Sequence, residues 1–165
     1  MKRPVLALLV LALTVGGYFL TRDDDAAILT RQLRRIETMG SHQSGEGQIP
    51  RQARAANLRE LFTPDTSLLI RIPDHGERKL SNREELMDVV RQVKAGVDAM
   101  RLEFLDPKVT VFADRRVAEA RTTLRATIGE NANSQQLFVE LKVQWRREDG
   151  NWAIEGIETI RTVGR

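Results

Sequence analysis

The sequence predicts an α+β domain in which a curved, bulged antiparallel sheet wraps around helices that come first in the chain. Apolar residues recur at helical spacing as far as about residue 99, and from about residue 101 they alternate with polar residues. The pair Asp149-Gly150 stands between two alternating segments, which is a strong hairpin signal. An apolar N-terminal segment adds one predicted transmembrane helix.

The first 25 residues are expected to form this membrane segment and its acidic flank. Residues 4–20 carry no charge, follow Lys2 and Arg3, and precede aspartates at 23–25. A run of about 17 apolar residues is near the lower limit for crossing a bilayer. Basic residues before the run favour a cytoplasmic N-terminus and a periplasmic or extracytoplasmic domain. We therefore expect a single-pass signal-anchor in the cytoplasmic (inner) membrane.

A cleaved secretory signal is the alternative for the same segment, and it would give a secreted domain. Small residues near positions 14–17 offer cleavage positions, but cleavage there would leave the apolar residues 18–20 on a mature N-terminus. The anchor is therefore favoured. The chain contains no cysteine, which excludes both disulfides and an acylated-cysteine anchor.

Composition limits the classes of partner. Residues 26–165 are enough for one domain with a proper core. The net charge is +3, of which Lys2 and Arg3 supply two units, and the remaining basic residues are scattered among acidic ones. This balance argues against a nucleic-acid partner.

Three helices are expected in the domain. The first opens at the aspartates 23–25, with Asp25 as its cap, and ends at Gly40. The second opens at Pro50 and stops at the turn 63–65. The third follows a short hairpin of strands at 66–72 and 77–80, and runs from a capping box at Ser81 and Glu84 to about residue 99. Its expected inner face is Leu86, Val90, Val93 and Val97.

Five strands are expected after the helices, at 101–105, 108–113, 117–128, 136–147 and 152–160. A two-residue Asp149-Gly150 loop would pair Trp145 with Ile154, and Arg147 with Trp152. The alternation slips by one residue at Glu155-Gly156, which predicts a β-bulge there.

This order of elements resembles the nuclear transport factor 2-like superfamily, which includes ketosteroid-isomerase-like and polyketide-cyclase-like proteins with a cone-shaped, cystatin-like fold. The segments that carry the resemblance are ANLRELFTPDTSLLIRI, LSNREELMDVV, LEFLDPKVTVFADRRVAEARTTL and VELKVQWRREDGNWAIEGIE. The last is the most specific, because a charged Asp-Gly turn between two tryptophan-bearing strands is typical of the closing hairpin. The resemblance covers about residues 26–162 and implies a fold, with no particular function attached.

The interior of the cone is where enzymes of the superfamily carry their acids, histidines and tyrosines. Strand alternation and the third helix predict an inner face with Thr122 as its one polar member. Two interpretations stay open: small residues there admit a helix closely, or they leave a pocket for a small apolar ligand. The expected lining is Ala118, Ala120, Thr122, Leu124, Val139, Leu141, Val143 and Trp145 from the strands, with Val90 and Val93 from the helix.

Asp65 and His75 are the two candidates for a catalytic base, because the first follows the second helix and the second is at a turn. Both are also ordinary turn residues, and His42 is expected to be a solvated histidine of a mobile loop. The two histidines have no matching carboxylate, so no metal or other cofactor is predicted. An isomerase or dehydratase that uses Asp65 or His75 therefore ranks behind a role without catalysis.

The outer face of the sheet offers a surface for a protein partner or for self-association as a dimer. Phe138 beside Arg125 would form a modest apolar and cationic patch, and a solvated face with one isolated phenylalanine is the alternative. The expected partner face is Arg121, Arg125, Phe138 and Lys142. The sequence thus predicts a membrane-tethered domain that acts through protein contacts, with a binder of small apolar ligands as the alternative.

Overall fold

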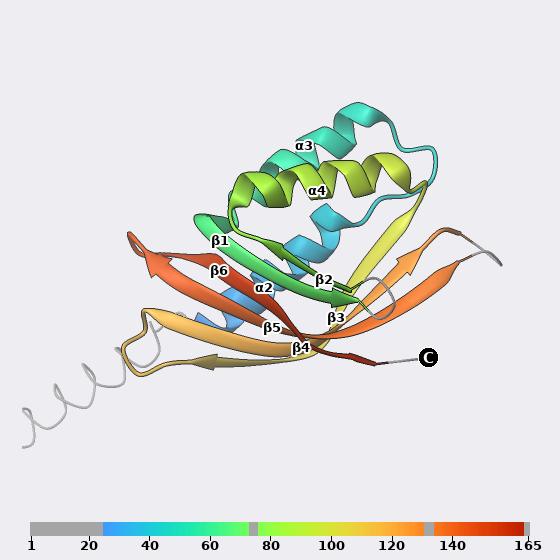
Figure 1. Cartoon of the computed structure of the whole chain (residues 1–165). Coiled ribbons are helices and arrows are strands. Elements are labelled where there is room, and N and C mark those ends of the chain that lie inside the picture. Colours follow the sequence, from blue (N-terminus) through green and yellow to red (C-terminus); the bar gives the residue numbers. More distant parts are fainter. Residues whose placement is uncertain (1–24, 73–75, 131–133, 164–165) are drawn as a thin grey trace, which may run out of the picture.

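The structure, a computed structural model, describes residues 25–72, 76–130 and 134–163. Its elements follow in the order α2 (Asp25–Gly40), α3 (Gln48–Arg59), β1 (Phe62–Ile72), β2 (Gly76–Leu80), α4 (Arg83–Gly96), β3 (Met100–Val111), β4 (Val117–Ile128), β5 (Gln135–Glu148) and β6 (Asn151–Val163). The sheet has six strands in the order β2-β1-β6-β5-β4-β3 and curves around the helices (Figure 1). The predicted α+β class and curved sheet are confirmed.

The predicted membrane segment lies outside the described residues. Within the part of the chain that the structure describes, no helix combines the length and the apolar character needed to span a bilayer. The anchor therefore stays a prediction.

Helices α2 and α3 form where the sequence predicts them. The apolar stripe of α2 is buried through Leu29, Leu33 and Ile36. Helix α3 begins two residues before the predicted start and holds Pro50 in its first turn. Proline is tolerated there because the first N–H groups of a helix have no partner within the helix.

The sequence predicts a turn at residues 63–65, but in the structure these residues are part of strand β1. Helix α3 has already ended at Arg59, and Leu61 and Phe62 lead the chain into the sheet, where both are buried. Strand β1 pairs in parallel with β6, and the register shifts between Phe62 and Ser67. Pro64 lies in this irregular stretch, where a strand can lose a ladder hydrogen bond at little cost.

The cap of α4 is one residue later than predicted. Asn82, not Ser81, is the N-cap, and its side-chain oxygen accepts a hydrogen bond from the backbone N–H of Glu85 at 2.9 Å. The carboxylate of Glu85 in turn accepts from the N–H of Ser81 at 2.8 Å. The helix ends at Gly96 instead of about residue 99.

The closing hairpin has the predicted register. Trp145 is opposite Ile154, and Arg147 is opposite Trp152. Asp149 and Gly150 have φ angles of 47° and 84°, as a tight two-residue turn with left-handed residues requires. The predicted bulge is confirmed, because Trp145 pairs with Ile154 but Gln144 pairs with Gly156. A second register shift, between Glu140 and Leu141, was not predicted.

Strand β3 is continuous, although the sequence predicts two strands separated by Asp106-Pro107. The structure places a bulge at these residues, where the register with β4 shifts between Leu105 and Lys108 and Asp106 has a φ of 48°. A bulge accommodates an extra residue without ending the strand. The proline therefore bends β3 instead of breaking it.

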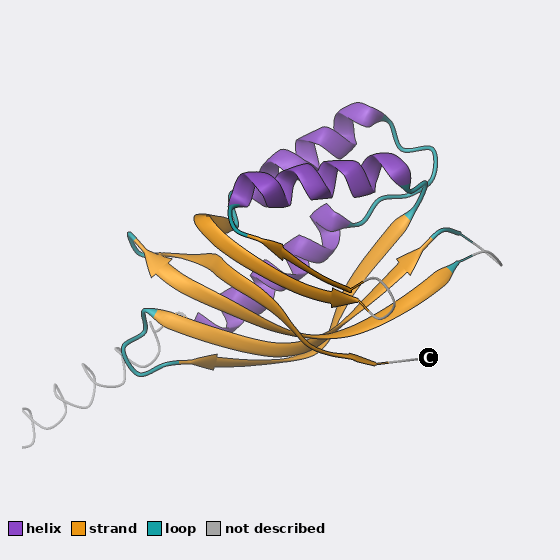
Figure 2. Cartoon of the chain, viewed as in Figure 1, coloured by secondary structure: helices purple, strands orange, loops and turns teal. Residues whose placement is uncertain are grey.

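The helices gather on one side of the curved sheet (Figure 2). Helix α2 contacts β3, whereas α4 contacts β1 and α3. The apolar residues of α2 belong to the same core as Ala118, Ala120, Val143 and Trp145. The same core includes Leu86 and Met87 of α4, so both α2 and the later helix that the sequence suggested contribute to it.

The free edge of β3 is occupied along its first half by groups from α2 and the following loop. The N–H of Leu102 donates to the hydroxyl of Ser41 at 2.9 Å, and the N–H of Phe104 donates to the carboxylate of Glu37 at 2.5 Å. His42 exchanges two backbone hydrogen bonds with Met100, at 2.8 and 2.9 Å. The loop is thus fixed to the sheet.

Candidate functional site

Most of the predicted inner face is buried, as expected. Ala118, Ala120, Val143 and Trp145 are 0% exposed, and Thr122, Val139 and Leu141 are also buried. Leu124 and Val90 are partly buried. Val93 is an exception, because it is 39% exposed and so lies outside the lining. The buried face of α4 instead includes Leu86, Met87 and Lys94.

The polar side chains next to this inner face are bound within the chain. The hydroxyl of Thr122 donates to the carbonyl of Leu105 at 2.8 Å, beside the bulge in β3. The indole of Trp145 donates to the side-chain oxygen of Gln32 at 3.0 Å, and the amide nitrogen of Gln32 donates to the carbonyl of Trp152 at 2.8 Å. These bonds join α2 to the closing hairpin.

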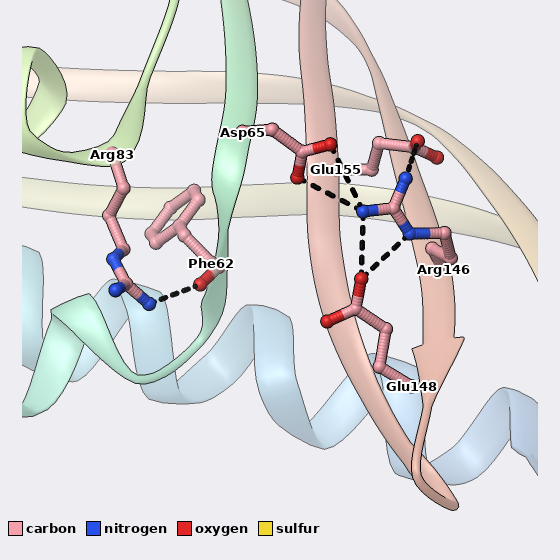
Figure 3. A network of polar contacts seen from close by, with 6 residues as sticks. All are labelled: Phe62, Asp65, Arg83, Arg146, Glu148 and Glu155. Atoms are coloured by element: carbon pink, nitrogen blue, oxygen red, sulfur yellow. Dashed lines mark hydrogen bonds and ion pairs between the residues drawn. The ribbon is translucent and has the colours of Figure 1, made fainter.

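Asp65 lies in a charged network on the exposed side of the sheet. Its carboxylate accepts from the guanidinium of Arg146 at 3.0 and 3.2 Å, and Arg146 also pairs with Glu148 and Glu155 (Figure 3). The nearby hydroxyl of Thr63 and then the hydrogen bond from Arg146 lower the pKa of Asp65 below its ordinary value of 3.8. A carboxylate that is exposed and held ionised is a poor general base near neutral pH.

The same close-up shows a second contact that fixes the start of β1. The guanidinium of Arg83 donates to the carbonyl of Phe62 at 3.1 Å (Figure 3). It ties the first turn of α4 to the strand. His75, the other candidate base, lies outside the described residues, so its role stays a prediction.

His42 is buried, in contrast to the solvated loop histidine that the sequence predicts. Its side chain is 4% exposed, and Nε2 is 2.8 Å from the carbonyl of Val97. A carbonyl only accepts, so Nε2 carries the proton in this contact and Nδ1 is the acceptor when the ring is neutral. Nδ1 is buried without a hydrogen-bond partner among the described residues. The sequence gives no sign of this, because the backbone pairing with Met100 is long-range.

His42 lines a hollow of about 990 Å³. Helix α2, the loop after it and the first half of β3 form its walls. Its charged lining residues are Glu37, Glu46, Arg54, Arg101 and Glu103. Glu37 is engaged by the N–H of Phe104, and Glu46 pairs with Arg54. The hollow is therefore open and polar, and it is not the apolar interior that the sequence predicts.

Two buried charged groups were not recognised in the sequence. Asp25 was expected only to cap α2, but its carboxylate is 5% exposed and binds Arg115, Arg147 and the indole of Trp152. Burial alone would raise the pKa of Asp25. The hydrogen bonds from Arg115 and Trp152 and the charges of both arginines outweigh this effect, so the pKa is below the ordinary value of 3.8.

Lys94 is the second buried charged group, at 5% exposed, and its ammonium donates to the carbonyl of Met39 at the end of α2. Burial, followed by the charges of Arg54 and Arg51, lowers the pKa of Lys94 to about 8. The spacing of Lys94 from Met87 and Val90 places it on the inner stripe of α4, and this was the signal available in the sequence.

The basic residues of the predicted partner face form ion pairs. Arg121 is opposite Lys142, and Arg125 is opposite Phe138. Arg125 pairs with Glu103 at 2.7 Å and Lys142 with Glu158 at 2.7 Å, while Arg121 contacts Glu119 on its own strand at 3.2 Å. Phe138 is half-buried among them. The described residues contain no cluster of side chains that could hold a metal ion.

The architecture defines a cystatin-like, nuclear transport factor 2-like domain, and similar solved structures agree. A protein of Streptomyces avermitilis from this family, provisionally described as a dehydratase, matches with a TM-score of 0.66 and 17% identity over 88% of this chain and 100% of the other. An uncharacterised cystatin-like protein of Caulobacter vibrioides matches with a TM-score of 0.64 and 14% identity, over 85% of this chain and 89% of the other. A protein of unknown function from Pseudomonas putida matches with a TM-score of 0.62 and 14% identity, over 82% of this chain and 84% of the other.

These identities are low, so the similarity shows the fold alone. No curated protein matches the sequence. The family model of the SnoaL-like domain, however, matches residues 51–158. The chain therefore belongs to the SnoaL-like domain family.

Proposed function

We propose that this chain is a membrane-tethered SnoaL-like domain that acts outside the cytoplasm by contact with a protein partner, and not by catalysis. The observation that carries the proposal is the chemistry of the buried inner face. Thr122 is the one polar side chain in its predicted lining, and its hydroxyl is used by the carbonyl of Leu105. Proton transfer needs a titratable group within hydrogen-bond reach of the substrate, and Asp65 is exposed in an ion-pair network instead.

The tether is supported by the sequence of residues 4–20 with its basic and acidic flanks. The intact mass of the protein extracted from membranes tests it. A mass equal to that of all 165 residues supports an anchor, and a mass that lacks the leader contradicts it.

The contact surface that we propose is the outer face of β4 and β5 around Phe138. A protein interface commonly has an apolar or aromatic centre with a charged rim, and Phe138 has Arg125 opposite it with Lys142 and Arg121 further along the strands. The ion pairs of these residues with Glu103, Glu119 and Glu158 would then form the rim.

Photocrosslinking in intact membranes tests this surface. A photoreactive phenylalanine analogue at position 138 should give one discrete protein adduct, either with a partner or with a second copy of this chain. The same analogue at Phe112 is the control, because Phe112 is 47% exposed and bonds to Val117 at the start of β4, whereas Phe138 is opposite Arg125 near the other end of that strand. No adduct at position 138, or the same adducts at both positions, would contradict the proposed surface.

A small-molecule role is the second candidate, because buried His42 has an unpartnered Nδ1 and lines the 990 Å³ hollow. A ligand with a hydroxyl or N–H donor would satisfy that nitrogen. The similar structure from Streptomyces avermitilis is provisionally described as a dehydratase, which supports an enzymatic role as one form of this candidate. Native mass spectrometry of the purified chain should then show a retained small molecule that is lost in His42→Phe, and a bare wild-type chain would argue against this role.

A further inference from the structure

The contact between α3 and α4 brings several positive charges together, and only some of them pair with a carboxylate among the described residues. The two helices lie side by side (Figure 1). Between them is a hollow of about 330 Å³ lined by Arg51, Gln52, Ala55, Arg91, Lys94 and Ala95. Arg91 pairs with Asp88. Arg51 and Lys94 have no ion-pair partner among the described residues and contact only carbonyl oxygens.

The contacts of Arg51 are weak. Its guanidinium donates to the carbonyl of Lys94 at 3.4 Å and to that of Gln43 at 3.5 Å, both at the long limit for a hydrogen bond. Its Nε is buried without a partner. A guanidinium has five donors in a fixed fork that fits the oxygens of a phosphate or a carboxylate. Most of that donor capacity is unused here.

The buried ammonium of Lys94 adds to the free-energy cost of placing positive charges together in this groove. A buried ammonium without a carboxylate partner is unfavourable, and two arginines nearby add repulsion. Its lowered pKa of about 8 reflects this cost. A methionine would fill the same volume without the charge. A destabilising buried charge retained at one position is the kind of compromise that proteins show at binding sites.

A purely structural role accounts for only part of these facts. Lys94 donates to Met39 at the C-terminal end of α2, where a cation interacts favourably with the helix dipole. That contact gives a structural reason for the buried charge of Lys94. It does not explain why Arg51, with a buried unpaired Nε, is placed beside it at the mouth of a hollow.

We propose that the groove between α3 and α4 binds an oxyanion through Arg51 and Lys94. The ligand carries a phosphate or carboxylate group, with Ala55, Ala95 and the arginine stems beside a small organic body. The site is separate from the proposed partner face, which belongs to β4 and β5, and it does not depend on that proposal.

Inorganic phosphate is the probe for the test, and the full chain in detergent is the sample. Thermal unfolding and amide NMR shifts are compared between phosphate and chloride at matched ionic strength. Phosphate should raise the unfolding temperature of the wild type and shift amides of α3 and α4. Arg51→Gln should bind at least about tenfold more weakly, the value for loss of a charged hydrogen bond. Arg59→Gln is the matched control, because Arg59 is on α3 but pairs with Glu84.

Two further measurements complete the test. Glycerol phosphate and acetate replace phosphate, and the tighter binder distinguishes a phosphate monoester from a carboxylate ligand. The pKa of Lys94, followed by NMR of its side chain, should rise when the anion binds, and binding should weaken as pH rises through 8. The charged groups near Lys94 are Arg51 and Arg54 from α3 and Arg91 on α4, and Arg54 in turn pairs with Glu46 in the loop before α3.

The result that would overturn the proposal is equally specific. If none of the three anions acts on the wild type, the groove is not an oxyanion site. If the wild type, Arg51→Gln and Arg59→Gln respond alike, the groove takes up an adventitious ion only. An unchanged Lys94 pKa in saturating anion would lead to the same conclusion, even if a variant fails to fold.

Discussion

Replacing Trp145 with alanine should lower the free energy of unfolding by about 3–5 kcal/mol, the usual cost of removing a large buried aromatic side chain. Trp145 is 0% exposed and lies in the core that joins α2 to the sheet. The variant also leaves the side-chain oxygen of Gln32 without its donor, since the indole N–H supplies that bond at 3.0 Å. Denaturant unfolding followed by circular dichroism measures the change.

Two variants separate the causes. Trp145→Phe keeps most of the volume and loses the hydrogen bond, so it should cost clearly less than the alanine variant. Phe112→Ala removes an aromatic side chain that is 47% exposed and should change stability by no more than about 0.5 kcal/mol. If Trp145→Ala cost no more than Phe112→Ala, the packing of α2 against β5 described above would be incorrect.

Replacing Asp25 with alanine should destabilise the domain by about 2–4 kcal/mol at neutral pH, because removal of one member of a buried ion pair leaves the other charges uncompensated. Arg115 would lose a hydrogen bond of 2.8 Å, and the indole of Trp152 one of 3.3 Å. The expected loss is moderate because the side chains of both arginines remain 33% exposed. Asp98→Ala, at an exposed carboxylate, is the matched control.

The pH dependence of this effect has a definite sign. The folded-state pKa of Asp25 is below its ordinary value of 3.8, so the folded state binds the proton less readily than the unfolded state does. The contribution of Asp25 is therefore complete above about pH 5 and is lost as pH falls through the folded pKa. The stability difference between wild type and Asp25→Ala should shrink over this acidic range. A difference that stays constant down to pH 2 would contradict the ion-pair interpretation.

The sequence predicted the elements well where the determinants are local. Strand β4 has the predicted bounds, and the Asp149-Gly150 turn fixed the register of the closing hairpin because a two-residue loop permits one pairing. The bulge near Gly156 followed from a one-residue slip in the alternation. The errors arose where long-range pairing overrides a local signal. Pro64 is typical of a turn, but parallel pairing with β6 draws it into β1.

The site was less predictable than the fold. The ion pair of Asp65 is with Arg146, which is 81 residues away in the sequence, and buried His42 pairs through its backbone with distant Met100. Val93 was predicted on the inner face, but its neighbour Lys94, about 100° further around α4, is the buried residue. Charged side chains on an apolar stripe are ambiguous until the neighbouring helices are placed.

The groups that cover β3 have a consequence for how the domain behaves when crowded. An uncovered outer strand can recruit a strand from another molecule, and fibre-like polymers grow in this way. Ser41, Glu37 and His42 already satisfy the first half of β3, and the opposite outer strand, β2, presents Glu77, Arg78 and Lys79 to solvent. Copies at high local concentration would thus be protected against open-ended polymerisation through these two strands.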